Sequence, residues 1–220
     1  MKPLPTVEGG FRCISADPAW RHVSRSPKGQ TSRSPSHHYP TMALEEIKAL
    51  PVREVAARSC HLFLWTTWPH LAQALEVIPA WGFTYSTGFL TWVKLNPRAA
   101  DEMFLVPAHF HVGMGYTSRK NTEILLLGRR GAPKRNSKSI RELMIAARRQ
   151  HSRKPDEAVA RIEAYCDGPR LELFARESRP GWSTWGLEAT KFDPPAPVVT
   201  VPIGSSDCPP AAPLFDAEAA

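Results

Sequence analysis

The sequence predicts an α/β protein with a mostly parallel sheet that is covered by helices on both faces. Short apolar runs typical of buried strands alternate along the chain with longer stretches typical of amphipathic helices. A length of 220 residues, a hydrophobic content of 42% and seven Trp residues suffice for one domain with a sizeable core.

The first predicted strand, Phe11–Ala16, is followed directly by Asp17, Pro18, Ala19 and Trp20. This combination suits the methylation of an exocyclic amine, whose lone pair is delocalised into its ring. The Asp17 carboxylate and the Pro18 carbonyl can each accept one N–H of such an amine. Trp20 offers a face on which a base can stack. The alternative is an ordinary strand end and turn, because Asp and Pro are common in turns.

The next segment, Arg21–His38, is rich in Ser and contains four basic residues and no acid, which predicts a loop. This loop is either a lid over the target base or a solvated surface loop. Beyond it, Thr41–Arg58 fits a helix with Thr41 as its N-cap. Glu45 and Glu46 would lie in the first turns, where acids are favoured.

The remaining elements alternate as the fold class requires. The predicted strands are His61–Thr66, Phe83–Lys94, Thr122–Leu127 with Gly128 ending it, and Leu171–Arg176 as the final core strand. The predicted helices are Pro69–Ile78, Ser139–Arg149 and Pro155–Ala164. Seven prolines after Ala189 predict a disordered or loosely packed tail over residues 189–220, following one domain over residues 1–188.

The charge of the chain points to an anionic partner. The formal net charge is +7, which favours nucleic acid. The basic stretch Arg129–Lys154 is expected to bind phosphates, and the alternative is a solubilising surface. No run approaches the ~20 apolar residues that span a bilayer. We therefore expect no membrane contact and a cytoplasmic location.

The sequence predicts no metal site. The four cysteines show no CxxC pair and no zinc spacing, and we expect Cys13 and Cys60 to be reduced residues in or near the core. His109 and His111 would share a strand face and could hold a metal, but no further ligand stands at a recognisable spacing. Ordinary surface or packing histidines are the favoured interpretation.

Several short blocks occur in a specific order. They are Ser15–Trp20, His38–Met42, His61–Thr67, Ala80–Phe83, Thr91–Lys94, Gly113–Tyr116, Arg153–Glu157, Leu171–Arg176 and Pro180–Trp182. Together they resemble the MT-A70 family of adenine N6-methyltransferases in its bacterial or phage form, from about Glu8 to Glu188.

The resemblance implies a Rossmann-like class I methyltransferase fold in permuted order. The strand with the catalytic motif comes first, and the strand that heads the S-adenosylmethionine pocket comes near the C-terminus. The implied reaction is methyl transfer from S-adenosylmethionine to the N6 amine of adenine in nucleic acid. DNA is favoured, and the sequence leaves RNA open as the alternative. One alternative is a catalytically weak or inactive nucleic-acid-binding member of the family. Methylation of a protein or small-molecule amine is another.

The resemblance also implies roles for individual residues. Asp17, Pro18 and Trp20 match the catalytic motif, and Lys154 matches a lysine that meets the donor's carboxylate. The position of Lys154 before a predicted helix start suits an anion. The residues expected in the donor pocket are Asp17, Lys154, Glu172, Phe174, Arg176 and Glu188. Glu172 and Arg176 would share one face of the last strand, either near the donor's ribose or as a structural salt bridge.

The acceptor side is predicted from fewer signals. Tyr39 matches the family's aromatic residue beside the base pocket. Lys94 follows Trp92 at a strand end and could meet a phosphate or the base. Three alternating residues approach the strand Thr122–Leu127 and either line the cleft or solvate a strand edge: Arg119, Asn121 and Glu123.

Two residues depart from the family pattern. Ala19 stands where the family has a second proline, which loosens the loop without removing the Pro18 carbonyl. Leu187 stands where the family has a polar residue, often Asn, so Glu188 is the residue left to make a contact there.

Overall fold

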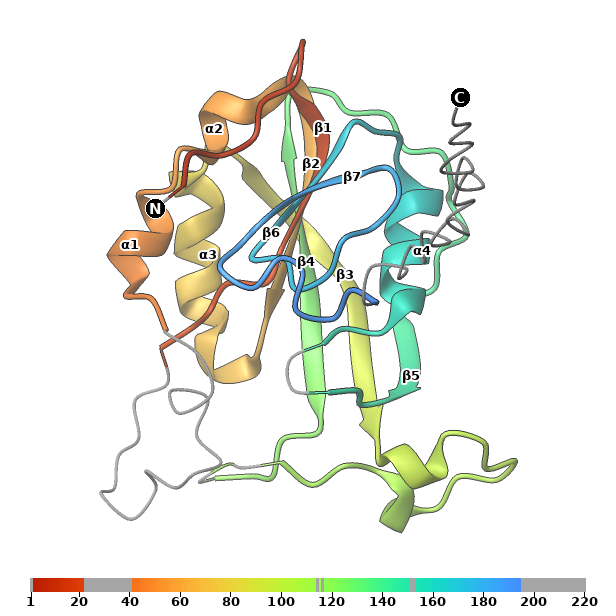
Figure 1. Cartoon of the computed structure of the whole chain (residues 1–220). Coiled ribbons are helices and arrows are strands. Elements are labelled where there is room, and N and C mark those ends of the chain that lie inside the picture. The colour runs from red at the N-terminus through yellow and green to blue at the C-terminus, as the bar shows by residue number, and fades with distance from the viewer. Residues whose placement is uncertain (1, 22–40, 114, 116, 151–152, 195–220) are drawn as a thin grey trace, which may run out of the picture.

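In a computed structural model of the chain, which describes residues 2–21, 41–113, 115, 117–150 and 153–194, a seven-stranded sheet forms the centre (Figure 1). The strand order is β5-β3-β4-β2-β1-β6-β7. The strands are β1 Phe11–Ala16, β2 Ala56–Thr66, β3 Thr84–Leu95, β4 Thr122–Arg130, β5 Leu143–Ala147, β6 Arg170–Leu173 and β7 Trp182–Trp185. Of these described strands, β4 alone runs antiparallel to its neighbours. The mostly parallel sheet predicted from the sequence is thus confirmed.

Helices cover both faces of this sheet (Figure 1). One face carries α1 Leu44–Lys48, α2 Val52–Val55 and α3 Leu71–Ala80, and the other carries α4 Asp156–Tyr165. Side chains of β2 alternate between the two cores, with Leu62 and Leu64 on the α3 side and Phe63 on the α4 side. None of the described helices has the length and apolar character needed to cross a bilayer.

The permuted order implied by the family resemblance is visible in the pairing of β1. This first strand lies between β2 and β6, with Ser15 opposite Phe63 on one side and Glu172 on the other. β1 lies near the start of the domain in sequence and β6 near its end, yet the two strands are direct neighbours in the sheet. Because they are parallel, their carboxyl ends meet at the same edge of the sheet.

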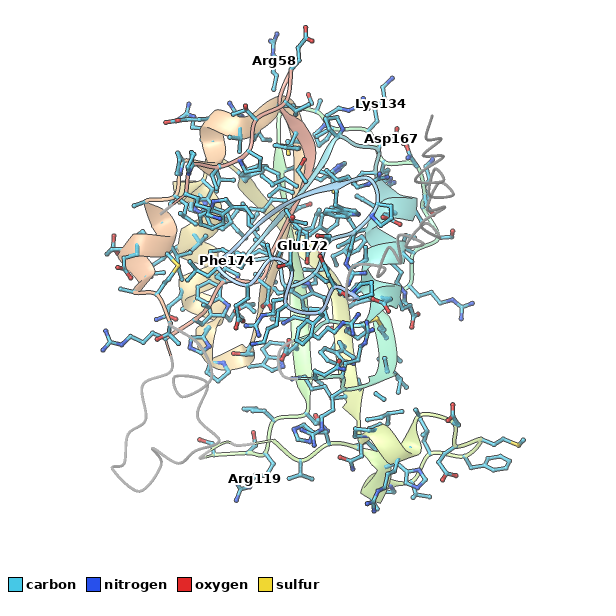
Figure 2. The ribbon with its side chains drawn as sticks, in the orientation of Figure 1. Arg58, Arg119, Lys134, Asp167, Glu172 and Phe174 are labelled. Atoms are coloured by element: carbon cyan, nitrogen blue, oxygen red, sulfur yellow. The ribbon has the colours of Figure 1, made fainter. Side chains whose placement is uncertain are left out.

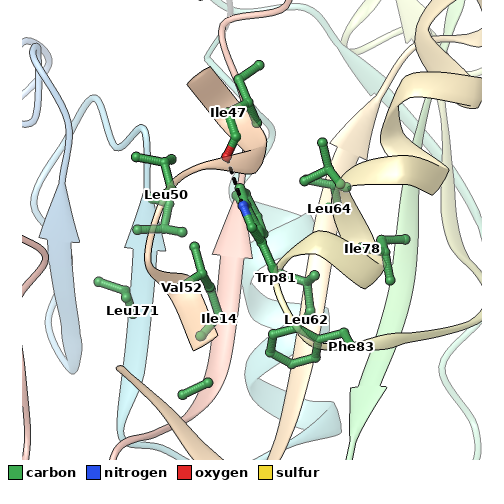
Figure 3. Close-up of a cluster of buried hydrophobic side chains, with 14 of the residues drawn as sticks. Ile14, Ile47, Leu50, Val52, Leu62, Leu64, Ile78, Trp81, Phe83 and Leu171 are labelled. Carbon is green, nitrogen blue, oxygen red and sulfur yellow. Dashed lines mark hydrogen bonds between the residues drawn. The ribbon is translucent and has the colours of Figure 1, made fainter. Parts of the chain in front are cut away.

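The core beside α3 is organised around Trp81 (Figure 3). The indole is completely buried, and its Nε1–H donates to the Ile47 carbonyl of α1 at 2.9 Å. That bond joins the short helix α1 to the turn after α3. Leu62, Ile78 and Phe83 belong to the same cluster.

The helix predicted over Thr41–Arg58 is wrong in extent. Two short helices, α1 and α2, occupy part of it, and Ala56 to Arg58 already belong to β2. Pro51 separates the two helices because it has no N–H and disfavours a helical residue before it. The N-cap is Ala43 and not Thr41. The Ala43 N–H donates to the Glu46 carboxylate at 2.7 Å.

The helix predicted over Ser139–Arg149 is also wrong, because this stretch contains the edge strand β5. Leu143 and Ile145 are exposed while Met144 is buried, which is the alternation of a strand. The residues are good helix formers, but pairing with the free edge of β3 decides the outcome.

Three smaller predictions also failed. β4 continues through Gly128 to Arg130, so Gly128 does not end it. β6 stops at Leu173 and is followed by β7, so Leu171–Arg176 is not the final strand. His109 ends a short 3-10 helix and His111 follows it outside any strand, so the two do not share a strand face.

The predicted tail is described only at its start. The Phe192 N–H donates to the Arg176 carbonyl at 3.0 Å, and the Ser178 N–H donates to the Asp193 carboxylate at 2.6 Å. Residues 195–220 lie outside the described part of the chain. The boundary after residue 188 therefore stays a prediction.

Replacing Trp81 by Phe should lower the free energy of unfolding. The change removes a buried hydrogen bond to the Ile47 carbonyl, which costs about 1–3 kcal/mol. Trp81→Ala should cost more, about 3–5 kcal/mol, because a cavity is added. Urea denaturation followed by circular dichroism measures both. An unfolding midpoint equal to wild type for Trp81→Phe would contradict this account of the core.

Candidate active site

The site lies where β1 and β6 end side by side. Asp17 follows β1, and its backbone N–H donates to the carbonyl of Leu173, the last residue of β6, at 3.4 Å. Phe174 comes next and has a φ of 61°, which is rare for a non-glycine residue. The chain therefore changes direction immediately after β6, beside the end of β1. Asp17 and Phe174 consequently line one pocket.

Lys154 is the centre of a partly buried ionic network. Its ammonium donates to the Asp17 carboxylate at 2.5 Å and lies 3.1 Å from the Glu123 carboxylate. The same nitrogen stands 5.3 Å from the centre of the Trp65 ring. Glu123 is in turn paired with Lys94. Asp17, Lys154, Glu123 and Lys94 thus form a row of alternating charges whose sum is zero.

The charges of this row set the protonation of its members. Burial by itself would raise the pKa of Glu123, but the ammonium groups of Lys154 and Lys94 outweigh it and lower that pKa to about 2. Burial would lower the pKa of Lys154, yet the carboxylates of Asp17 and Glu123 raise it. Glu123 is therefore ionised and Lys154 charged throughout the physiological range.

Pro18 follows Asp17 directly, and the role of its carbonyl as an acceptor for the amine stays a prediction. That carbonyl accepts the Trp20 backbone N–H at 2.8 Å. A carbonyl oxygen has two lone pairs, so this bond leaves an acceptor position.

Trp20 itself is buried. Its indole N–H donates to the Trp65 carbonyl at 3.2 Å, and its ring stacks on His70 with the centroids 5.8 Å apart. Its backbone also pairs with that of Met42. These contacts hold the loop to the end of β2. Base stacking by Trp20 stays a prediction.

A hollow lies between the end of β6, the start of α4 and the chain after Phe174. Residues that line it are Ser15, Asp17, Trp65, Arg153, Lys154, Ala158, Val159, Ile162, Glu172, Phe174, Arg176, Glu177, Arg179 and Trp182. Five of the six residues predicted for the donor pocket are among them, namely Asp17, Lys154, Glu172, Phe174 and Arg176, whereas Glu188 does not line the hollow. Figure 2 shows Glu172 and Phe174 close together near the middle of the molecule.

Glu172 has an unusual environment in this hollow. Its Oε2 is buried and has no hydrogen-bond partner among the described residues, and the same holds for the Nε of Arg179, 3.8 Å away. Burial raises the pKa of Glu172 to about 7, and Arg179 offsets this only in part. Near neutral pH this carboxyl is balanced between its neutral and charged forms.

Arg176 lies beside Glu188, whereas the sequence predicted that it shares a strand face with Glu172. Because β6 ends at Leu173, Arg176 does not share a strand face with Glu172, and that prediction is wrong. Arg176 is instead 3.6 Å from Glu188, which also binds Lys191 at 2.5 Å. Leu187 is 84% exposed, so the family's polar position presents an apolar side chain to solvent.

The sequence missed the ionic cluster that forms the outer wall of the hollow. Arg153 binds Glu177 at 2.5 Å, Arg179 also binds Glu177, and Arg179 lies 3.0 Å from Asp156 at the start of α4. The alternating charges after β6 were a signal for this cluster. Their partners in α4 are distant in sequence and could not be identified.

Of the three alternating residues predicted on the acceptor side, only Glu123 joins the network. The Asn121 carbonyl accepts the Lys94 backbone N–H at 2.9 Å, which is a structural contact. Arg119 is exposed in the connection between β3 and β4, at the lower end of Figure 2. Tyr39 lies outside the described residues.

The structure divides the predicted basic stretch Arg129–Lys154. Lys134 lies at the end of the molecule opposite Arg119, with Glu172 between them (Figure 2). β5 then runs parallel to β3 and brings the second part of the stretch, from Arg148 to Lys154, to the pocket side. Phosphate binding by the basic stretch stays a prediction, and its two parts lie in different regions of the molecule. No group of three His, Cys, Asp or Glu side chains that could hold a metal occurs within the described residues.

Comparison with known proteins agrees with this geometry. The family model described as MT-A70 matches residues 11–188. The chain belongs to the MT-A70 family. The MT-A70 match begins with β1 and ends after β7, so it includes every strand of the sheet and all residues of the ionic network.

Individual relatives of this MT-A70 protein differ in length. It is 29% identical to the Type II methyltransferase M.MunI of a Mycoplasma species, over 81% of this chain and 77% of the relative. It is 30% identical to the N(6)-adenine-specific methyltransferase METTL4 of Homo sapiens, over 87% of this chain but 40% of the relative. It is 29% identical to the N(6)-adenosine-methyltransferase MT-A70-like protein of Arabidopsis thaliana, over 82% of this chain but 24% of the relative. The chain thus spans less than half of the plant and human relatives.

Replacing Glu123 by Gln should reduce stability at neutral pH. The folded pKa of about 2 lies below the ordinary value of 4.5, so the ionised form stabilises the fold above pH 4.5 and this contribution is lost as the pH falls toward 2. The shift corresponds to about 3 kcal/mol. Urea denaturation should show a large deficit for the variant at pH 7 and a smaller one at pH 3. Equal deficits at both values would contradict the charge pairing.

Glu172 should have the opposite effect on stability. Its folded pKa of about 7 lies above 4.5, so wild-type stability should fall as the pH rises from 4.5 to 7, by about 3 kcal/mol in total. Glu172→Gln is neutral at every pH and should not show this loss. The variant should gain on wild type between pH 5 and pH 8 in thermal denaturation. Parallel curves would mean that Glu172 is not desolvated.

Proposed function

We propose that this protein transfers a methyl group from S-adenosylmethionine to the N6 amine of adenine in nucleic acid. The observation that carries the proposal is the position of Asp17 at the end of β1, in the wall of a pocket that also contains Lys154, Glu172 and Phe174. Membership of the MT-A70 family supports the same reaction. The names of M.MunI and METTL4 agree with it.

The groups in the pocket fit the chemistry of S-adenosylmethionine. Lys154 supplies a cation for its carboxylate. The buried Glu172 oxygen and Arg179 Nε supply an acceptor and a donor for its polar groups, and neither has a hydrogen-bond partner among the described residues. Phe174 and Trp182 supply apolar surface. When bound, this cofactor provides an electrophilic methyl group on a sulfonium.

Asp17 and the Pro18 carbonyl would act on the acceptor amine. By accepting its two N–H bonds, they orient the nitrogen and favour the geometry in which its lone pair can attack. Both groups are fixed before the amine arrives, Asp17 by Lys154 and Pro18 by its ring and the bond to Trp20. Positioning of this kind costs little reorganisation during the reaction.

Lys154 would link the two halves of the site. The Asp17 oxygen that it now binds is an acceptor that the amine requires. When Lys154 turns part of its hydrogen bonding toward the donor's carboxylate, that oxygen becomes available, while Glu123 keeps the ammonium in place. Donor binding would therefore prepare the acceptor site.

We favour DNA over RNA as the acceptor. The chain spans 77% of the bacterial Type II methyltransferase but only about a quarter of the plant relative named for adenosine, which favours the bacterial type of enzyme. A cytoplasmic location fits the free, buried thiols of Cys13, Cys60 and Cys166. A non-catalytic binding protein is not favoured, because Asp17, Lys154 and the donor pocket are all retained.

The direct test is to incubate the purified protein with isotopically labelled S-adenosylmethionine and, separately, duplex DNA, single-stranded DNA and RNA. Mass spectrometry of the digested nucleosides identifies the product. N6-methyladenine in DNA alone supports the full proposal, and N6-methyladenine in RNA alone corrects the choice of acceptor. Labelling of none of them contradicts the proposal.

Asp17→Asn should abolish methyl transfer and leave donor affinity equal or higher. The amide lacks the negative charge of the carboxylate that accepts an N–H of the amine. Loss of one such acceptor raises the reaction barrier by about a few kcal/mol. The same change releases Lys154 from its competitor for the donor's carboxylate. Turnover assays and calorimetry with S-adenosylhomocysteine measure the two effects.

Asp101→Asn is the matched control, because Asp101 is exposed in the connection between β3 and β4. It should retain wild-type turnover. Near-wild-type turnover of Asp17→Asn would remove Asp17 from the reaction. A large loss of donor affinity in that variant would remove the competition for Lys154.

A further inference from the structure

Trp68 is an exposed aromatic residue next to the site for which the reaction described above gives no role. It begins a short 3-10 helix, Trp68–His70, directly after the carboxyl end of β2. Its side chain is 50% exposed. Only two other aromatic side chains are counted as exposed among the described residues, Tyr85 and Phe104.

The Trp68 ring is held in place from one side. Its indole N–H donates to the Thr122 hydroxyl at 3.0 Å, and Thr122 is the first residue of β4. A surface side chain bound in this way loses little freedom when a ligand covers its open face. The geometry thus combines a fixed orientation with an accessible apolar surface, which are the properties of a stacking platform.

The neighbours of Trp68 place it at the edge of the acceptor site. Thr122 is followed by Glu123, which binds Lys154, which binds Asp17. Because successive side chains of a strand point to opposite faces, Thr122 with Trp68 and Glu123 with Lys154 lie on opposite sides of the start of β4. Trp68 therefore contacts the residue that precedes Glu123 in the strand but is separated from the pocket itself.

Trp20 is far less accessible than Trp68 in this arrangement. Its ring is 6% exposed and stacks on His70, two residues after Trp68. The same short helix therefore contacts Trp20 with His70 and presents Trp68 outward. An aromatic face is available to a nucleobase at Trp68.

We propose that the indole of Trp68 stacks on a nucleobase that flanks the target adenine. This inference rests on the proposed function, because it requires a nucleic-acid substrate. The ligand is one unpaired or unstacked base of the strand that is methylated. Stacking on an aromatic side chain tolerates any base, so Trp68 contributes affinity and alignment of the strand without selecting a sequence.

The test is a thermodynamic cycle between Trp68 and the flanking base. The probes are fluorescein-labelled single-stranded DNA oligonucleotides with one adenine, either intact or with an abasic position on its 5′ or its 3′ side. Trp68→Leu should weaken binding of the intact strand about 5- to 150-fold, because a base stacked on an aromatic ring contributes that much. One abasic position should weaken wild-type binding similarly, and should have little further effect on Trp68→Leu.

Matched variants separate stacking from folding. Trp68→Phe keeps an aromatic ring and should recover most of the affinity that Trp68→Leu loses. Tyr85→Ala removes an aromatic side chain of 46% exposure at the opposite end of the sheet, where Tyr85 pairs with Gly128, and should bind like wild type. Donor affinity, measured with S-adenosylhomocysteine, should be unchanged in all three variants.

The outcomes distinguish the two levels of inference. If wild type neither binds nor methylates nucleic acid, the proposed function fails and the stacking role fails with it. If wild type methylates DNA while Trp68→Leu binds every probe equally well, only the stacking role is wrong. Additive losses from Trp68→Leu and both abasic positions would also overturn it. An altered oligomeric mass with unchanged DNA affinity would assign Trp68 to a contact between protein copies.

Discussion

The placement of one partly buried ammonium group organises this end of the molecule. Lys154 lies between the carboxylates of Asp17 and Glu123, and so connects the end of β1, the start of β4 and the segment before α4. A charged lysine is costly to remove from water unless opposite charges surround it, and removal of one partner from such a group is destabilising. The same contacts fix Asp17, the acid that the proposed reaction requires. Stability and the proposed chemistry therefore depend on the same three side chains.

Sequence patterns predicted those elements whose identity is settled locally. β1 was predicted with its observed bounds, and α4 was predicted to within one residue at each end, because an apolar run and a proline-started amphipathic stretch are unambiguous. β5 was missed because helix-forming residues there pair with the open edge of β3. The prediction that β4 ends at Gly128 was wrong for a related reason. β2 pairs with one side of that strand and β3 with the other, and both pairings continue past Gly128. Non-local pairing overrides local preference in each case.

The site residues show the same difference between what local sequence predicts and what non-local contacts decide. The motif from Asp17 to Trp20 and the block around Lys154 are continuous in sequence, so both could be assigned to one reaction before the fold was known. The contact between Glu123 and Lys154 joins residues that are distant in the chain, and no spacing indicates it. Arg119, Asn121 and Glu123 alternate identically, yet the fold brings only the last into the network. Exposure was equally hidden, because nothing in the sequence distinguishes the buried Trp20 from the open Trp68.

The reversed direction of β4 has a consequence for how such proteins diversify. β3 ends and β4 begins at the edge that carries Asp17, so the chain leaves the sheet after Leu95 and returns to it at Thr122 on the side of the candidate site (Figure 1). Lengthening or exchanging this connection would leave every strand pairing intact. The sheet and Lys154 can then stay the same in related proteins. The connection between β3 and β4 can differ between them and alter which substrates each protein binds.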